Sequence, residues 1–351
     1  MNVTEDYQGH SSSSFNYSLA NGTSGNGTMK GFQPLFPPGM DKAISGITIT
    51  ILFTTMISLG CTMKIDKIKH HIVRPSGVGI AVVAQFVIMP LSAFCLAKIL
   101  QLGPTETMTV LICGCCPGGN LSNILALALQ GDMNLSVVMT TCSTVLALGA
   151  MPLLLFLYCQ GLANLENAVP YIKIFIALLM TLVPCAVGIT INHWAPRYSQ
   201  FIIKAGFCIL LIASVVIGTI CGITLGATVW IMLSPQILVV GSLMPFIGYL
   251  LGYTMSLIFK QNGPCSRTIA METGCQNVQL CSAILKVTFP PDEIGPLFLF
   301  PVVYVIFQGA EALFLIMLFR IYQRFKPSAE GEISRQSDVN SNLNRRHKYD
   351  C

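Results

Sequence analysis

Residues 111–130 read LICGCCPGGNLSNILALALQ, an apolar stretch interrupted in its middle by Pro-Gly-Gly-Asn at positions 117–120. About 20 predominantly apolar residues suffice to cross a bilayer as a helix. A break inside such a helix is tolerated where other groups of the protein satisfy the freed backbone. The stretch therefore predicts a membrane helix that unwinds at 117–120, inside the protein and not against lipid.

Apolar runs of similar length recur along the chain. Of its 351 residues 53% are hydrophobic and only 10% are charged, whereas soluble domains carry about 25% charge. We predict an all-α polytopic membrane protein with nine transmembrane helices, residues 43–325. The expected spans are 43–63, 76–99, 106–129, 133–159, 171–192, 202–225, 236–259, 268–288 and 296–320.

The two ends of the chain predict its orientation. Residues 1–42 form a polar head whose four N-x-S/T sites favour an extracellular, glycosylated segment. These sites are Asn2, Asn16, Asn21 and Asn26. The first loop after the head is basic, which is typical of the cytoplasmic side; it carries Lys64, Lys67, Lys69 and Arg74. We therefore expect a plasma-membrane protein with an extracellular N-terminus and an odd number of spans.

The remaining basic charge follows the same topology. The formal net charge is +5, but the Lys and Arg residues lie in short loops and in the tail, so we expect membrane lipid and not nucleic acid as the surrounding partner. The tail, 326–351, is rich in Ser, Glu, Asn and Arg. Such a composition buries too little apolar surface to fold alone, which predicts a disordered cytoplasmic tail.

An internal repeat is indicated by equal spacing. Pro90 precedes Gly119 by 29 residues, and Pro245 precedes Gly274 by 29 residues. The second to fourth spans thus match the seventh to ninth, five crossings later, and an odd offset inverts one copy relative to the other. Inverted repeats with paired interrupted helices are typical of transporters. Chance recurrence of Met-Pro pairs is the alternative, and the equal spacing favours the repeat.

Only two acidic residues, Glu272 and Glu311, lie deep within predicted spans. A charged side chain there costs about 2.5–3.5 kcal/mol on insertion scales, so something must compensate it. Oxygen-bearing side chains accumulate around Glu272 and at the matching break: Gln85, Ser122, Asn123, Ser136, Thr140, Thr273 and Gln276. For Glu311 only Gln308 stands nearby as a partner, and we expect a structural or gating role.

The set around Glu272 contains no thiolate or imidazole. Oxygen ligands with one carboxylate suit a monovalent hard cation, which we interpret as sodium, with a proton as the second choice. A polar network that only joins helices is the alternative. Cys113 and Cys116 have C-x-x-C spacing but lack further ligands for zinc. We expect no enzyme and no cofactor, because no nucleophile–base pair, phosphate loop or cofactor motif is present.

Four motifs carry a resemblance to a known family. They are CGCCPGGNLSN at 113–123, GDMNLS at 131–136, MTTCST at 139–144 and METGCQNVQLCS at 271–282. Over about residues 43–325 the chain resembles the sodium/bile acid cotransporter family. The resemblance implies a core domain from spans 76–159 and 236–320, with the interrupted helices crossing in it. It also implies a panel domain from spans 43–63 and 171–225.

The same resemblance implies sites and a function. The first sodium site would use Ser122, Asn123, Ser136, Thr140 and Glu272. The second would use Gln85 and Gln276 with backbone carbonyls near Thr273. Asn120 and Asn277 are expected to contact the substrate. The expected function is sodium-coupled import of bile acids, taurocholate-like amphipathic anions, by alternating access. Transport of sulfated steroids, a cation channel and a membrane receptor are the alternatives.

Overall fold

The computed structural model describes residues 38–63, 76–160, 171–225, 234–289, 297 and 299–346. Within these ranges the regular structure is helical, apart from one isolated bridge between two residues. The long helices are α1 (Pro38–Thr62), α7 (Met133–Gln160), α8 (Tyr171–Trp194), α9 (Pro196–Leu225), α11 (Pro235–Ile258) and α15 (Phe300–Arg346). The shorter ones are α3 (Ser76–Val83), α4 (Met89–Ile99), α5 (Pro104–Cys115), α6 (Asn120–Ala128), α12 (Gly263–Gly274) and α13 (Val278–Thr288).

The predicted all-α fold is confirmed for the described residues. Six apolar stretches in them are long enough to cross a membrane. They are Ser45–Thr62, Val78–Ile99, Met133–Gln160, Tyr171–Trp194, Pro235–Ile258 and Phe300–Phe325. Large apolar side chains on these helices face outward, for example Met180 and Leu313, which are 64% and 63% exposed. An outer surface of this kind suits lipid and not water.

Two helices are interrupted, the first of them where the sequence predicted. α5 ends at Cys115 and α6 begins at Asn120, while α12 ends at Gly274 and α13 begins at Val278. We call residues 116–119 the first break and residues 275–277 the second break. The breaks lie against each other: Gly118 and Gln276 form the antiparallel bridge, and the Asn277 N–H donates to the Pro117 carbonyl at 2.9 Å.

A π-helical turn precedes Pro90. Helix α3 continues into η1 (Ala84–Ile88) and then α4, and the Met89 N–H donates to Ala84 O, five residues back. Pro90 has no N–H to offer the carbonyl four residues before it, so the backbone there has one bond fewer. Single π turns inside α-helices are frequent at functional sites. Gln85 lies in this turn and is buried.

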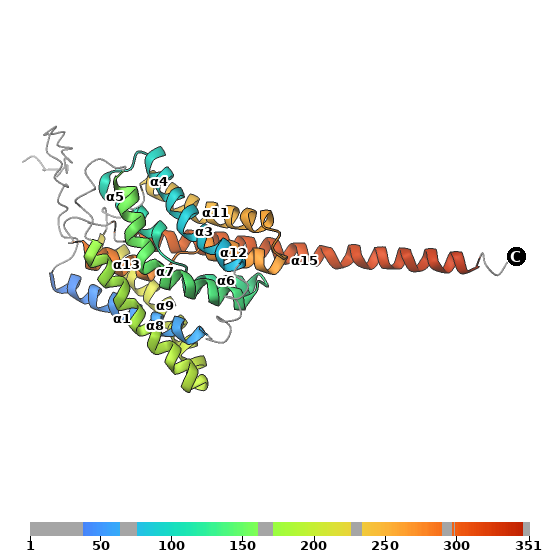
Figure 1. Cartoon of the computed structure of the whole chain (residues 1–351), viewed down its shortest axis with the longest axis horizontal. Helices are drawn as coiled ribbons and strands as arrows, with labels where there is room; N and C mark the ends of the chain where they lie inside the picture. The colour runs from blue at the N-terminus through green and yellow to red at the C-terminus, as the bar shows by residue number, and fades with distance from the viewer. Residues whose placement is uncertain are drawn as a thin grey trace, which may run out of the picture.

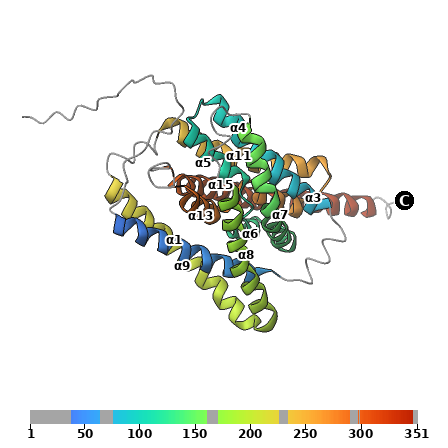
Figure 2. The ribbon, with the colours of Figure 1, turned by 60° about the vertical axis from the view of Figure 1, so that its left-hand side comes forward.

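Helices α1, α8 and α9 pack together along one side of the molecule (Figures 1 and 2). Helices α1 and α8 approach closely at Gly60 and Gly188. A Cβ added at Gly60 would lie 2.1 Å from the Cys185 carbonyl oxygen, and one at Gly188 would lie 2.2 Å from that of Ile57. Small residues permit such contact between membrane helices. These three helices correspond to the spans 43–63 and 171–225.

The C-terminal segment differs from the sequence-based expectation. Helix α15 extends through Arg346, and Figure 1 shows it leaving the bundle as a long rod. Residues 326–346 are therefore helical, although their composition predicted no regular structure. Adding turns to an existing helix costs much less than nucleating one, and α15 supplies the nucleus. The head with its four sequons, and the basic loop 64–75, lie outside the described residues.

Candidate functional site

The first cluster forms where α6, α7 and α12 meet. Ser136 and Thr140 lie one turn apart on the same face of α7, as i and i+4 positions do. The Ser136 hydroxyl lies 2.6 Å from Glu272 Oε1 and 2.7 Å from Asn123 Oδ1. The Thr140 hydroxyl lies 3.0 Å from each carboxylate oxygen of Glu272 and 3.3 Å from Asn123 Oδ1. All four side chains are buried.

Ser122 completes the predicted group. Its hydroxyl donates to the Gly119 carbonyl at 2.6 Å and also reaches the Glu272 carboxylate. The five residues proposed from sequence for a first ion site therefore do lie together, around one carboxylate. Gly118 borders them: a Cβ at this position would lie 2.7 Å from Glu272 Oε2. Position 118 must hold a small residue, because the carboxylate occupies the adjacent space.

The first cluster suits a hard cation better than a soft one. Its acceptors are a carboxylate, an amide oxygen and hydroxyls, and oxygen-only sets of this kind bind such cations. The Asn123 Nδ2 atom is buried and has no hydrogen-bond partner in the part of the chain that the structure describes. No group of three His, Cys, Asp or Glu side chains that could hold a metal ion occurs among those residues either. The cluster has one carboxylate, that of Glu272, and a single negative charge suits a singly charged ion.

The second cluster joins the two breaks. The Gln85 amide nitrogen donates to the Cys116 carbonyl at 2.7 Å and to Gln276 Oε1 at 2.8 Å. Gln276 Nε2 in turn lies 3.2 Å from the Thr273 carbonyl. The hydroxyl of Thr273 points away and donates to Ile269 O at 2.8 Å. Thr273 can therefore offer its backbone oxygen to an ion, and its side chain is already committed.

Three further side chains hold the second break in place, and their role is not evident from the sequence alone. Tyr304 donates its hydroxyl to the Gly274 carbonyl at 2.9 Å. Gln308 Oε1 accepts the Gln276 N–H at 3.1 Å. Tyr249 donates to the Gln308 carbonyl at 2.8 Å and so fixes that turn of α15. Each is buried, and a polar side chain in an apolar span is the only sequence signal they give.

The expectation that Gln308 could serve as the partner of Glu311 is not met. The Gln308 side chain is turned toward the second break. The Oε2 atom of Glu311 is buried without a hydrogen-bond partner among the described residues. Residues 308 and 311 are three apart and lie on one face of α15, but the Gln308 amide oxygen is used by the Gln276 N–H.

The two asparagines expected to contact substrate have different outcomes. Asn277 is buried and its Oδ1 accepts the Leu280 N–H at 3.0 Å, so it caps the N-terminus of α13. The side chain of Asn120 is outside what the structure describes, although its backbone begins α6. Substrate contact stays a prediction for both residues. Both stand at the start of a helix whose positive end meets the crossing of the breaks.

Comparison with known proteins identifies the family. The profile of the Sodium Bile acid symporter family matches residues 49–240. The hepatic sodium/bile acid cotransporter of Homo sapiens is 52% identical over 302 residues, which cover 84% of this chain and 86% of the relative. The chain belongs to the sodium bile acid symporter family. The family and the names of these relatives describe membrane transporters and not enzymes.

Other members of the sodium bile acid symporter family are more distant. The sodium/bile acid cotransporter 4 of Rattus norvegicus is 39% identical over 314 residues, 87% of this chain and 72% of the relative. The ileal sodium/bile acid cotransporter of Homo sapiens is 39% identical over 295 residues, 84% of each chain. The wording of the motifs at 118–123 and 272–277 predicts greater similarity to the hepatic than to the ileal member, and these identities confirm it.

Proposed function

We propose that the protein is a sodium-coupled symporter that imports bile acids or closely related amphipathic anions by alternating access. One observation supports this most strongly: a single buried carboxylate, Glu272, surrounded by hydroxyl and amide groups where two interrupted helices cross. Ionisable groups inside the membrane commonly mark ion or substrate pathways. Crossing discontinuous helices are typical of secondary transporters.

The first sodium ion would bind among Ser122, Asn123, Ser136, Thr140 and Glu272. The hydroxyls of Ser136 and Thr140 now donate toward the Glu272 carboxylate. Because a hydroxyl carries both a proton and acceptor lone pairs, rotation about its C–O bond turns an oxygen toward a cation. The ion neutralises the carboxylate, which lowers the cost of keeping that charge inside the membrane.

A second sodium ion would bind at Gln85 and Gln276 with the Thr273 carbonyl. The Gln276 amide nitrogen now contacts that carbonyl at 3.2 Å, and an inverted amide group would present its oxygen instead. Gln85 bridges from η1 to both breaks. An ion here would therefore tie the two breaks together, which couples the second cluster to the first through the shared segment 272–276.

Sodium binding would prepare the site for the anion. Helices α6 and α13 both begin at the breaks, and the positive ends of their backbone dipoles favour a negative group there. Asn120 and Asn277 stand at those ends and are our proposed substrate contacts. Sodium entry supplies the driving force, including about 2.3 kcal/mol for each net charge per 100 mV of membrane potential.

The movement would occur between two groups of helices. The group α1, α8 and α9 corresponds to the proposed panel domain, and the remaining helices to the proposed core domain of two inverted repeats. Rocking of one group against the other around a fixed site is the usual form of alternating access. The nine-span topology belongs to this proposal: the interrupted pairs α5–α6 and α12–α13, and α9, would add three crossings to the six apolar stretches.

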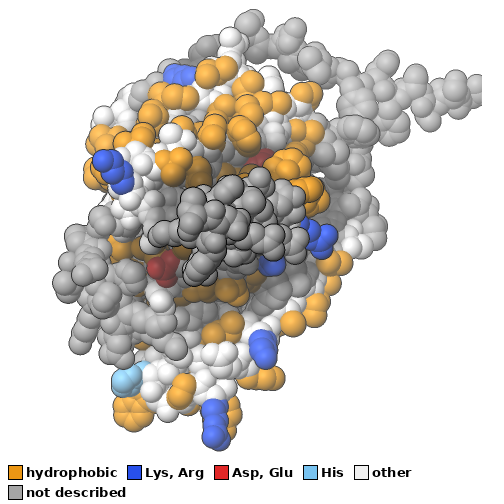
Figure 3. Space-filling model, turned by 90° about the vertical axis from the view of Figure 1, so that its right-hand side faces the viewer, with side chains coloured by type: hydrophobic (Ala, Val, Ile, Leu, Met, Phe, Trp, Pro, Cys, Tyr) orange, Lys and Arg blue, Asp and Glu red, His pale blue; other side chains and the backbone are white. Residues whose placement is uncertain are grey.

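The proposed orientation has an extracellular N-terminus and a cytoplasmic C-terminus. Figure 3 views the end of the bundle from which α15 extends and shows Lys and Arg side chains spread around it. Basic residues at one end of a membrane bundle favour its cytoplasmic location. Glycosylation at Asn2, Asn16, Asn21 and Asn26 belongs to the same proposal, since these sites would then face the cell exterior.

Tracer uptake tests the function directly. Cells producing the full chain should accumulate labelled taurocholate with sodium present and not with choline in its place. Glu272→Gln should abolish this uptake, because the first site loses its only negative charge. Glu106→Gln is the matched control: Glu106 caps α5 at the Gly103 N–H, and the amide oxygen of Gln keeps that cap. Sodium-independent uptake, or a fully active Glu272→Gln variant, would contradict the proposal.

The alternatives make different predictions in the same cells. A carrier for sulfated steroids would accumulate a steroid sulfate with sodium and discriminate against taurocholate. A cation channel would pass sodium current without accumulating either anion, although it too would depend on Glu272. A receptor would bind ligand without sodium-dependent accumulation.

A further inference from the structure

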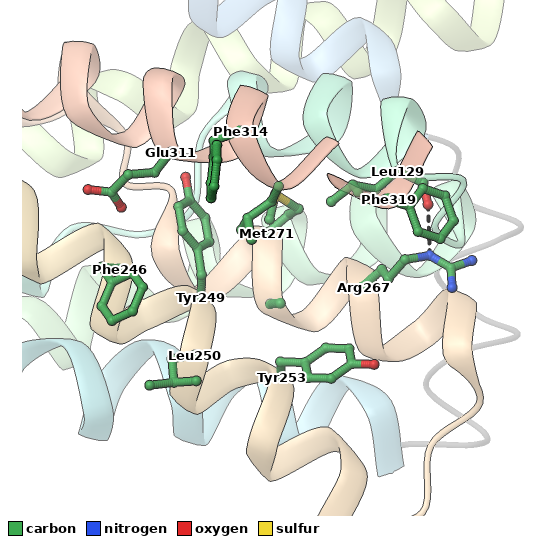
Figure 4. Close-up of a pocket in the computed structure, with 12 residues that line it drawn as sticks. Leu129, Phe246, Tyr249, Leu250, Tyr253, Arg267, Met271, Glu311, Phe314 and Phe319 are labelled. Atoms are coloured by element: carbon green, nitrogen blue, oxygen red, sulfur yellow. Dashed lines mark hydrogen bonds between the residues drawn. The ribbon is translucent and has the colours of Figure 1, made fainter. Parts of the chain in front are cut away.

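A cavity of about 350 Å³ lies between α11, α12 and α15 (Figure 4). We call it the α15 cavity. None of the residues proposed for the two sodium clusters lines it, and none of its lining residues belongs to α1, α8 or α9. It is therefore distinct from both sodium clusters and from the boundary with the proposed panel domain, and it shares one wall residue, Tyr249, with the support of the second break. Its volume falls within the range of ordinary small-molecule sites.

The walls of the α15 cavity are apolar and open sideways. Phe246 and Leu250 of α11 are each 52% exposed, and Phe314 of α15 is 55% exposed. In a bilayer these side chains face hydrocarbon, because they lie in two of the apolar spans. A ligand would therefore enter from the lipid and would need an apolar body to do so.

One end of the cavity is basic. Arg267, near the start of α12, donates from Nε to the Leu129 carbonyl at 2.7 Å and from Nη2 to the Gln130 carbonyl at 2.8 Å. Its guanidinium carbon lies 4.7 Å from the centre of the Phe319 ring. These contacts hold the cation in place at the cavity wall. Arginine held in this manner can bind a sulfonate, sulfate or carboxylate.

The other end carries Glu311, and its surroundings are unusual. Its Oε2 atom is buried and has no hydrogen-bond partner among the described residues. Figure 4 shows the Tyr249 hydroxyl near the base of the Glu311 side chain, and that hydroxyl donates to the Gln308 carbonyl at 2.8 Å. A buried acceptor without a donor is costly. Glu311 lines the cavity, and rotation of its carboxylate would turn this oxygen toward a ligand hydroxyl there, which would remove the cost.

The distance between the two ends limits the ligand. Glu311 and Phe319 are eight residues apart on α15, or about 12 Å along its axis at 1.5 Å per residue. Arg267 lies against Phe319, and Figure 4 shows Glu311 and Arg267 at opposite ends of the cavity. The ligand must therefore be apolar, carry an anionic group at one end and offer a hydroxyl about 12 Å away.

We propose that the α15 cavity binds a hydroxylated steroid anion, with its acidic group at Arg267 and a ring hydroxyl donating to Glu311. This deepens the proposed function, on which it rests for the ligand class: the protein has a second, non-transport site for its own substrate. A phospholipid matches the cavity less well. Its polar groups stay at the membrane surface, and its acyl chain has no donor for Glu311.

Equilibrium binding without sodium isolates this site. The full-length protein is placed in phosphatidylcholine nanodiscs with choline chloride, so that the sodium-dependent transport site stays empty, and labelled taurocholate is titrated. Wild type should bind it saturably. Glu311→Leu should bind it about tenfold more weakly, as expected for one lost hydrogen bond to a charged group. Phe314→Trp, which narrows the cavity without touching either polar end, should also weaken binding.

Controls make the result specific. Met317→Trp places the same bulk on α15 at an exposed position that does not line the cavity, and it should bind like wild type. The taurine conjugate of cholanic acid, which lacks ring hydroxyls, should bind wild type about tenfold more weakly than taurocholate does. In Glu311→Leu the two ligands should bind equally, because the acceptor for the hydroxyl is gone.

Several outcomes would overturn the inference. They are an absence of saturable taurocholate binding without sodium, binding unaffected by Glu311→Leu and Phe314→Trp, or an equal effect of Met317→Trp. Native mass spectrometry that finds an anionic phospholipid held by wild type, lost in Phe314→Trp and not displaced by taurocholate would assign the cavity to lipid instead. Failure of sodium-driven uptake with intact sodium-free binding would contradict the proposed function and leave this site standing.

Discussion

The two breaks occupy equivalent positions in the proposed repeat, yet they are held differently. The second break is fixed from outside by α15, through Tyr304 at the Gly274 carbonyl and Gln308 at the Gln276 N–H. The first break is held by Gln85 at the Cys116 carbonyl and by the second break itself, at Pro117. The second break is thus supported by a helix outside both breaks, whereas the first break is supported by Gln85, by Ser122 at the Gly119 carbonyl and by the second break. We expect the second break to be the more rigid of the two.

This asymmetry has an electrostatic reason. A second carboxylate at the first break would repel Glu272 and would need a further cation inside the membrane. Asn123 stands near the first break instead and offers an amide oxygen beside the carboxylate. If the second break stays in place and the first break depends on it, sodium binding at Glu272 would order the first break against the second.

Glycine substitutions at the two breaks should have the largest and most different effects. In Gly118→Ala the new Cβ would lie 2.7 Å from Glu272 Oε2, so we expect a folded protein that has lost sodium-dependent taurocholate uptake. In Gly274→Ala it would lie 2.3 Å from a Tyr249 ring atom and 2.9 Å from the Pro245 carbonyl. We expect this second variant to lose folded protein itself, measured as the monodisperse fraction after purification.

Gly149→Ala is the control for both, because nothing lies within 4 Å of a Cβ added there. Equal loss of folded protein in Gly118→Ala and Gly274→Ala would show that the two breaks are equally rigid, and the comparison would then fail.

The second-largest effect is expected at Gln85, because its side chain contacts both breaks. Gln85→Leu removes the hydrogen bonds to Cys116 O and Gln276 Oε1. We expect sodium to be needed at about tenfold higher concentration for half-maximal uptake, as two buried hydrogen bonds are lost. The sodium dependence should also become less cooperative, because the proposed second ion loses a ligand. Exposed Gln236 on α11 supplies the control, Gln236→Leu, which should leave the curve unchanged.

Tyr304→Phe sharpens the comparison at the second break alone. The ring stays in place, and only the hydroxyl that donates to the Gly274 carbonyl is lost. A loss of about 1 kcal/mol for one hydrogen bond predicts a sodium requirement about fivefold higher. The taurocholate concentration for half-maximal uptake at saturating sodium should stay constant. Tyr198→Phe, at a residue 71% exposed on α9, is the control. A change in the taurocholate constant alone would place Tyr304 with the substrate and not with the ion.

The smallest effect is expected at the helix that follows the second break. Asn277→Ala removes the cap at the Leu280 N–H, and loss of such a cap costs about 1 kcal/mol of stability. Asn277→Asp keeps the cap and should restore thermal stability, while its added charge should weaken taurocholate binding. Thermal unfolding of the purified variants measures the first effect and uptake measures the second. If Asn277→Asp transports taurocholate like wild type, Asn277 does not contact the anion.

The sequence by itself determined the all-α class, the position of the first break and the residues that gather in the first cluster. These depend on local properties: apolar length, the backbone demands of Pro and Gly, and the shared face of Ser136 and Thr140 one turn apart. The need for polar partners around Glu272 is also evident from the sequence, because a carboxylate inside an apolar span requires them in any fold.

Only the tertiary structure decided which partners these were. Gln308 could have paired with Glu311 and instead accepts the Gln276 N–H, because the second break packs against this part of α15. Tyr304 and Tyr249 support the second break from helices distant in sequence, and the α15 cavity exists only because three helices leave it unfilled. Hydrogen-bond partners and cavities depend on the rotation and spacing of whole helices, which no local pattern of residues records.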